Sequence, residues 1–77
     1  MEVINYLGRL YELSVIGDIV NDRLELECWD LSPEGGGLLF TLWRDENSSL
    51  MLLPSQLPIP LDLLEKVAII AGTELIE

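Results

Sequence analysis

The fold is decided by residues 58–76, whose sequence is PIPLDLLEKVAIIAGTELI. Apolar residues recur there at intervals of three and four, which is the spacing of an amphipathic helix, and a proline at its start suits a first helical turn. On a helical wheel the apolar side chains cover about half of the circumference, enough to lie across a sheet. We therefore predict a helix over 60–72, with an extension to 76 left open because Gly72 suits a helix end.

The chain ahead of this helix predicts short strands. Apolar and polar residues alternate from Tyr11 onward, and the alternation resumes after 21–22, an Asn-Asp pair that tolerates the backbone of a tight turn. The predicted strands cover 10–20, 23–31, 38–44 and 49–53. They give an α+β fold in a single domain, 1–77: a four-stranded antiparallel meander packed by the C-terminal helix. The first ten residues are ambiguous, and we favour an extended segment over a helix.

The first hairpin can be given a register from the pattern alone. A two-residue turn at 21–22 pairs Val15 with Cys28 and keeps the apolar residues of both strands on one face. The same register places Asp18 opposite Glu25, and like charges in that position are unfavourable. An earlier turn or a bulge near Asp18 is therefore the alternative.

Charge is the strongest feature of the composition. The chain has 14 acidic residues against four basic ones, and its net charge is −10. Nucleic-acid affinity comes from lysine and arginine displacing counterions, so we expect no direct binding to DNA or RNA. The acidity is suited to attracting a basic protein by long-range steering, although keeping an apolar chain dispersed is the plainer interpretation.

Cysteine content and hydropathy bear on the compartment. The single cysteine, Cys28, cannot form an internal disulfide, so a reducing cytoplasm is the default. The N-terminal residues lack the basic and apolar regions of a secretory leader, and no apolar run reaches the roughly 18 residues that span a membrane. We expect a soluble cytoplasmic protein that does not enter a membrane.

The residues that usually carry enzyme chemistry are few. Histidine is absent from the sequence, and one cysteine without histidine is a poor nucleophile and a poor zinc site. Glu25 and Glu27 alternate on the outward face of a strand, where carboxylates are usually solvated. The glycine run in the predicted loop 32–37 lacks the lysine and the spacing of a phosphate-binding loop. We predict no enzyme, with no catalytic, cofactor-binding or metal-binding residues.

The predicted sheet is apolar on both faces, whereas one helix covers only one. If Leu26 and Phe40 face the helix, both tryptophans lie on the other face, and large aromatic residues are frequent at the centres of interfaces. The candidate interface residues are Trp29, Leu39, Trp43, Met51, Glu12, Glu25 and Glu27, with Ile69 and Ile76 of the helix extending the set.

These patterns favour a non-enzymatic protein–protein interaction module. The tryptophans would supply affinity, and the acids would select the partner, which is either a second copy in a homodimer or a basic protein. Other interpretations stay open: the N-terminal segment covers this face, the assignment of inside and outside is inverted, or the chain is an accessory subunit of a larger assembly. In size and charge the chain is also similar to small acidic inhibitors and immunity-type proteins, a likeness of composition alone.

Overall fold

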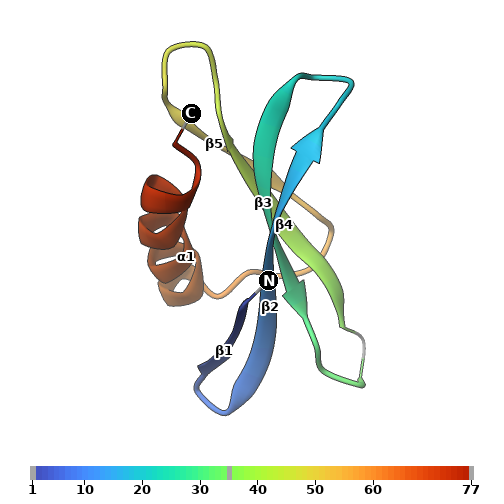
Figure 1. Ribbon diagram of the computed structural model, residues 1–77. Coiled ribbons are helices and arrows are strands. Elements are labelled where there is room, and N and C mark those ends of the chain that lie inside the picture. Colours follow the sequence, from blue (N-terminus) through green and yellow to red (C-terminus); the bar gives the residue numbers. More distant parts are fainter. Residues whose placement is uncertain (1, 35, 77) are drawn as a thin grey trace.

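The computed structural model describes residues 2–34 and 36–76, and within them the chain forms five strands and one helix (Figure 1). The elements are β1 (Glu2–Tyr6), β2 (Arg9–Asp18), β3 (Arg23–Asp30), β4 (Gly37–Arg44), β5 (Leu50–Pro54) and α1 (Leu61–Glu74). The strands form one antiparallel sheet in the order β1-β2-β3-β4-β5. The predicted α+β class and C-terminal helix are confirmed, but the sheet has five strands rather than four. Gly35, in the predicted loop 32–37, lies outside the described residues.

The additional strand is β1, in the segment that the sequence left ambiguous. A two-residue turn joins it to β2, with positive φ at both positions, 51° at Leu7 and 83° at Gly8. Two positive φ values match the twist of a hairpin, and the Asn5 side chain supports the turn by accepting the Gly8 N–H at 3.0 Å. The first residues therefore add an edge strand to the sheet and do not fold over the face that α1 leaves uncovered.

The register of β2 against β3 differs from the predicted one by two residues. Val15 lies opposite Leu26, two positions from its predicted partner, and Asp18 lies opposite Arg23. A shift of two keeps every side chain on its predicted face, because the side-chain period of a strand is two. In the observed register the residue directly opposite Asp18 is Arg23 and not Glu25.

The loop 19–22 between these strands is organised by Asp18. Its carboxylate accepts the backbone N–H of Val20 at 3.0 Å and of Asn21 at 3.2 Å, and the Asn21 side chain donates to it at 2.6 Å. The bonds from Asn21 hold the pKa of Asp18 below its ordinary value, against the opposing effect of burial. An ionised Asp18 thus stabilises a four-residue loop in place of the predicted two-residue turn.

The core lies between one face of the sheet and α1, which contacts chiefly β4 (Figure 1). The helix contributes a stripe of buried residues at intervals of four, which lies along one side of a helix. Leu26 and Phe40 face this stripe, as predicted. The buried core consists of Ile4, Tyr11, Leu13, Leu26, Cys28, Leu39, Phe40, Leu42, Leu63, Val67, Ala71 and Leu75.

Arg44, at the end of β4, closes the C-terminal end of the helix. The last turn of α1 has no basic residue of its own, although Asp62 complements the dipole at the first turn. Arg44 supplies the missing cation by donating to the carbonyls of Gly72 at 3.1 Å and Leu75 at 3.0 Å. A third bond at 2.7 Å reaches the carbonyl of Ser48. One side chain therefore joins the helix end to the turn between β4 and β5.

Candidate functional site

The candidate site is the open face, which we define as the face of the sheet that α1 does not cover. Residues opposite each other on neighbouring strands share a face, so the register assigns the side chains of the open face to three rows that each cross four strands and to two shorter rows, Asn5 with Leu10 and Asp18 with Arg23. The first row holds Val3, Glu12, Trp29 and Leu38. The second and third rows hold Ser14, Glu27, Thr41 and Leu53, and Ile16, Glu25, Trp43 and Met51.

The open face has two chemically different halves, and the boundary between them lies between β3 and β4. The acidic half lies on β2 and β3 and holds Glu12, Glu25 and Glu27. The apolar half lies on β4 and β5 and holds Trp43, Met51 and Leu53. Met51 is 39% exposed and Leu53 57%, so the apolar half is accessible. A surface of this kind offers carboxylates beside a contiguous apolar area.

Trp29 is fixed within the acidic half by a hydrogen bond on its own strand. Its indole Nε1–H donates to a carboxylate oxygen of Glu27 at 3.0 Å. The side chain remains 36% exposed, so the ring offers part of its surface to solvent while its polar edge is satisfied. An aromatic side chain held in one orientation loses little conformational entropy on binding.

Arg23 connects the two halves. Its Nε donates to a carboxylate oxygen of Glu25 at 2.8 Å, and its guanidinium lies 4.1 Å from the centre of the Trp43 ring. The charge of Glu25 is therefore balanced by Arg23, whereas neither Glu12 nor Glu27 forms a salt bridge within the described part of the chain. Sequence reasoning missed Arg23, although it shares the parity of the glutamates on β3 and that parity already placed it on this face.

Leu39, predicted on this face, is instead buried in the core and only 3% exposed. The register between β3 and β4 shifts between Cys28 and Trp29, so Leu38 rather than Leu39 lies opposite Trp29. An inserted residue of this kind is a β-bulge, which interrupts the alternation of side chains along a strand. Leu39 consequently packs with the helix side of the molecule, where it shares a pocket with Tyr11 and Pro60.

Ile69 and Ile76 do not join the tryptophans. They are 75% and 68% exposed; Ile69 lies on the side of α1 opposite its buried stripe, and Ile76 follows the end of the helix. Because α1 covers the other face of the sheet, the core separates Ile69 from Trp29 and Trp43, whereas Ile76 borders a pocket with Arg44 and Ser48 at the turn between β4 and β5. The structure thus brings together the predicted residues of the sheet, apart from Leu39, and leaves Ile69 and Ile76 outside the site.

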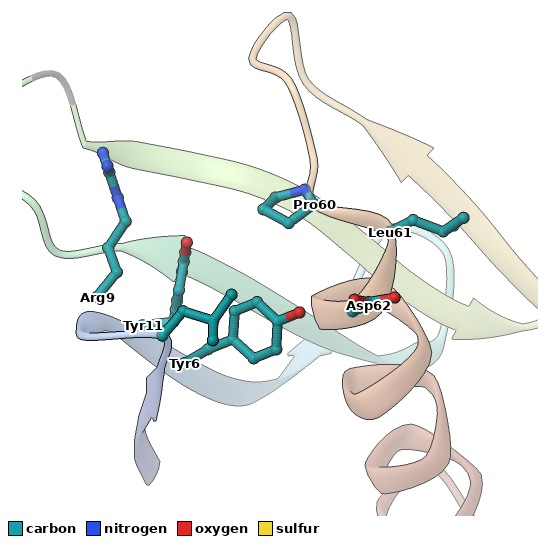
Figure 2. A pocket seen from close by; sticks show the side chains of 7 residues that line it. Tyr6, Arg9, Tyr11, Pro60, Leu61 and Asp62 are labelled. Atoms are coloured by element: carbon teal, nitrogen blue, oxygen red, sulfur yellow. The ribbon is translucent and has the colours of Figure 1, made fainter.

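A separate pocket of about 420 Å³ lies where the turn between β1 and β2 meets the start of α1 (Figure 2). The rings of Tyr6 and Tyr11 lie beside each other in it, and the Tyr6 hydroxyl points toward the first helical turn (Figure 2). Burial and then the Asp62 carboxylate raise the pKa of Tyr6. Arg9 borders the pocket but is already paired with Asp30 at 3.0 Å. Periodicity along the chain contains no signal for this pocket, since its walls come from two distant segments, 6–11 and 60–62.

Two ionisable groups lie close to the core. Burial, followed by the charge of Asp30, raises the pKa of the Cys28 thiol to about 12, and its side chain has no exposed surface. Burial also acts to raise the pKa of Asp30, but the hydrogen bond from the Ser32 N–H and the guanidinium of Arg9 outweigh it and keep that pKa low. Cys28 is therefore a protonated core residue at neutral pH.

No family model matches the chain, and no curated protein or solved structure matches it either. The described helix, 14 residues long, is too short to cross a membrane. Over residues 2–34 and 36–76, no three side chains of the metal-binding types gather in one place. The geometry of the open face is thus the basis for a functional proposal.

Proposed function

We propose that this chain is a non-enzymatic interaction module whose open face binds a basic, amphipathic segment of another protein. The observation that carries the proposal is the division of the open face into an acidic half and an apolar half. A segment with lysine or arginine along one side and apolar residues along the other complements both halves at once. The net charge of −10 adds long-range attraction for such a partner. A reducing cytoplasm suits the lone thiol of this module.

Two carboxylates give the acidic half its selectivity. Glu12 and Glu27 are half-buried, and neither is paired with a cation among the described residues, so a partner's basic side chain gains a charge-assisted bond there. Glu25 already has Arg23 as its partner at 2.8 Å and is less available. Charged contacts of this kind select partners and speed encounter, while the adjoining tryptophans contribute apolar contact area.

A second copy of the chain fits the open face poorly. Stacking two open faces would bury Glu12, Glu25 and Glu27 of each copy against the same residues of the other copy or against its apolar half. Only one glutamate of each set has a salt-bridge partner within the described residues. Either arrangement is unfavourable because a buried carboxylate loses its hydration without gaining a counter-charge. Of the two partners that the sequence left open, the basic protein is the one that this face favours.

The test uses a fluorescent amphipathic peptide of lysine and leucine, about 14 residues long, titrated with the protein at about 0.15 M salt. We expect the double variant Glu12→Gln/Glu27→Gln to raise the Kd about 10- to 100-fold through the loss of two charged contacts. The matched control is Glu65→Gln/Glu74→Gln, which removes the same charge from the exposed surface of α1. This control should change the Kd by less than about threefold.

Equal weakening by the two double variants would contradict the proposal, because binding would then follow net charge and not the open face. A peptide in which glutamate replaces lysine should not bind at all. Replacing Trp29 by alanine should weaken the lysine peptide without unfolding the protein, since that side chain is partly exposed. Unchanged affinity in this variant would also count against the open face as the binding surface.

A further inference from the structure

The strand β5 is an edge of the sheet with an unusual composition. Its sequence, LMLLP, has no charged residue, and all five of its residues are exposed. Edge strands in soluble proteins commonly carry charges, inward-pointing lysines or covering segments that prevent pairing with another chain. The other edge, β1, begins with Glu2 and includes Asn5, so it is more polar than β5. The free edge of β5 is thus open to pairing.

The pairing of β5 with β4 determines which backbone groups lie at the free edge. The Ser55 N–H donates to the Leu39 carbonyl at 2.9 Å, in the same register that pairs Thr41 with Leu53. Hydrogen-bonded and non-hydrogen-bonded pairs alternate in an antiparallel ladder, so the odd-numbered residues of β5 bond to β4. The groups directed away from β4 are therefore the N–H and C=O of Leu50 and Leu52 and the C=O of Pro54.

Pro54 fits this assignment. It has no N–H to donate, and it lies opposite Phe40 in a pair that exchanges no hydrogen bonds. The ladder between β4 and β5 is consequently intact despite the proline. The proline reduces only the number of donors at the free edge.

From these groups we propose that two copies of the chain form a dimer by antiparallel pairing of their β5 strands, centred on Leu52. In this register Leu52 of each copy donates its N–H to the Leu52 carbonyl of the other. Each Leu50 N–H then meets the Pro54 carbonyl of the other copy, which makes four hydrogen bonds in all. Each Pro54 serves only as an acceptor, so the Leu50 carbonyl opposite it receives no hydrogen bond from the other copy.

The side chains of the paired strands are compatible with this arrangement. Met51 of one copy lies across from Leu53 of the other on the open face, and the two Leu52 side chains meet on the helix side. No acidic residue lies on β5 or opposite it on β4, where Arg44 is the only charged residue. Two chains of charge −10 therefore bring no carboxylate of β5 into the pairing, whereas the other edge, β1, carries Glu2.

This dimer is independent of the proposed binding of a basic segment, because it uses backbone groups at an edge and not the carboxylates of the open face. A pairing of five residues buries less than the roughly 1,200 Å² of standard interfaces, so the dimer belongs to the weak class. It would place two apolar halves next to each other in a continuous ten-stranded sheet, built from two copies of the five-stranded one.

The experiment measures the mass of the full chain by sedimentation velocity from about 10 µM to about 1 mM. We expect reversible dimerisation that does not weaken as salt rises. In ¹⁵N-resolved hydrogen exchange, the amides of Leu50 and Leu52 should become slower as protein concentration rises. The amide of Leu53, bonded to β4, should be slow at every concentration.

Two variants test the edge directly. Leu52→Pro removes an N–H that points to solvent in the monomer, and Leu52→Lys places a charge at the centre of the pairing. Each should raise the dimer Kd at least about tenfold. The matched control is Leu31→Lys, at a leucine that is 44% exposed, compared with 41% for Leu52. The control should leave the dimer Kd unchanged.

A chain that stays monomeric at every concentration would overturn the proposal. So would a dimer in which the amides of Leu50 and Leu52 still exchange freely, or one that survives Leu52→Lys, since the copies would then meet elsewhere. If Leu52→Pro fails to fold, Leu52→Lys and the exchange measurement decide the question. Loss of dimerisation in Leu52→Lys with unchanged binding of the lysine peptide separates this proposal from the function of the open face.

Discussion

Replacing Arg44 by methionine should destabilise the protein more than any other change of a single partly exposed charged residue. The guanidinium makes three hydrogen bonds of 2.7–3.1 Å, two of them to the last turn of α1 and one to the turn before β5. Methionine keeps most of the aliphatic stem and removes these bonds together with the favourable interaction of a cation with the helix dipole. The perturbation therefore isolates the polar function of the side chain.

The magnitude follows from the number and exposure of these bonds. A hydrogen bond to a charged group contributes about 1.5–3 kcal/mol, and one that is partly exposed contributes less. Because Arg44 is only half-buried, we expect the three bonds together to contribute about 2–3 kcal/mol. The whole chain of 77 residues should have a free energy of unfolding of about 4–12 kcal/mol. Arg44→Met should accordingly lower Tm by about 10–20 °C.

The assay is urea denaturation followed by circular dichroism, with two control variants. Arg44→Lys keeps the charge near the helix end but cannot reach all three carbonyls, so it should lose about half as much stability. Lys66→Met removes the same charge from an exposed position of α1 and should change stability by less than about 0.5 kcal/mol. Equal stabilities of Arg44→Met and Lys66→Met would refute the role of Arg44 as the cap of the helix.

Two further predictions concern ionisation. The lowered pKa of Asp18 means that its charged form stabilises the fold, and this contribution is lost as pH falls through the folded-state pKa, below 3.8. The difference in unfolding free energy between the wild type and Asp18→Asn should thus be present at neutral pH and vanish in acid; a difference independent of pH would contradict it. Cys28, which is fully buried and has a pKa of about 12, should react with Ellman's reagent only as fast as the protein unfolds. Rapid labelling of the native protein would contradict the burial of this thiol.

The sequence was most informative where a pattern depends on side-chain period. The stripe that includes Leu63 and Val67 predicts the helix, and the alternation around Leu26 predicts which face of β3 is buried. An error of two residues in the register leaves each side chain on the same face. The residues predicted for the open face were therefore largely correct, although the turn predicted before Arg23 was not. The acids and tryptophans of the sheet were found together for this reason.

The remaining features depend on contacts that a pattern does not contain. A bulge adds one residue and inverts the faces beyond it, so alternation alone places Leu39 on the wrong side. The turn at Leu7 has positive φ at a leucine, a residue that rarely marks such turns. Arg44 caps a helix about 30 residues further along the chain, and only the folded arrangement brings the two together.

The most direct test of the open face as a binding surface is a titration of ¹⁵N-labelled protein with the lysine and leucine peptide. The chain has two tryptophans, so the spectrum contains two indole N–H signals, one from each half of the open face. Saturable shifts of both signals, with the amide of Ile69 on the outer side of α1 unchanged, are the expected result. Shifts that centre on α1, or that spread evenly over the acidic residues while both indole signals stay in place, would contradict the proposed function.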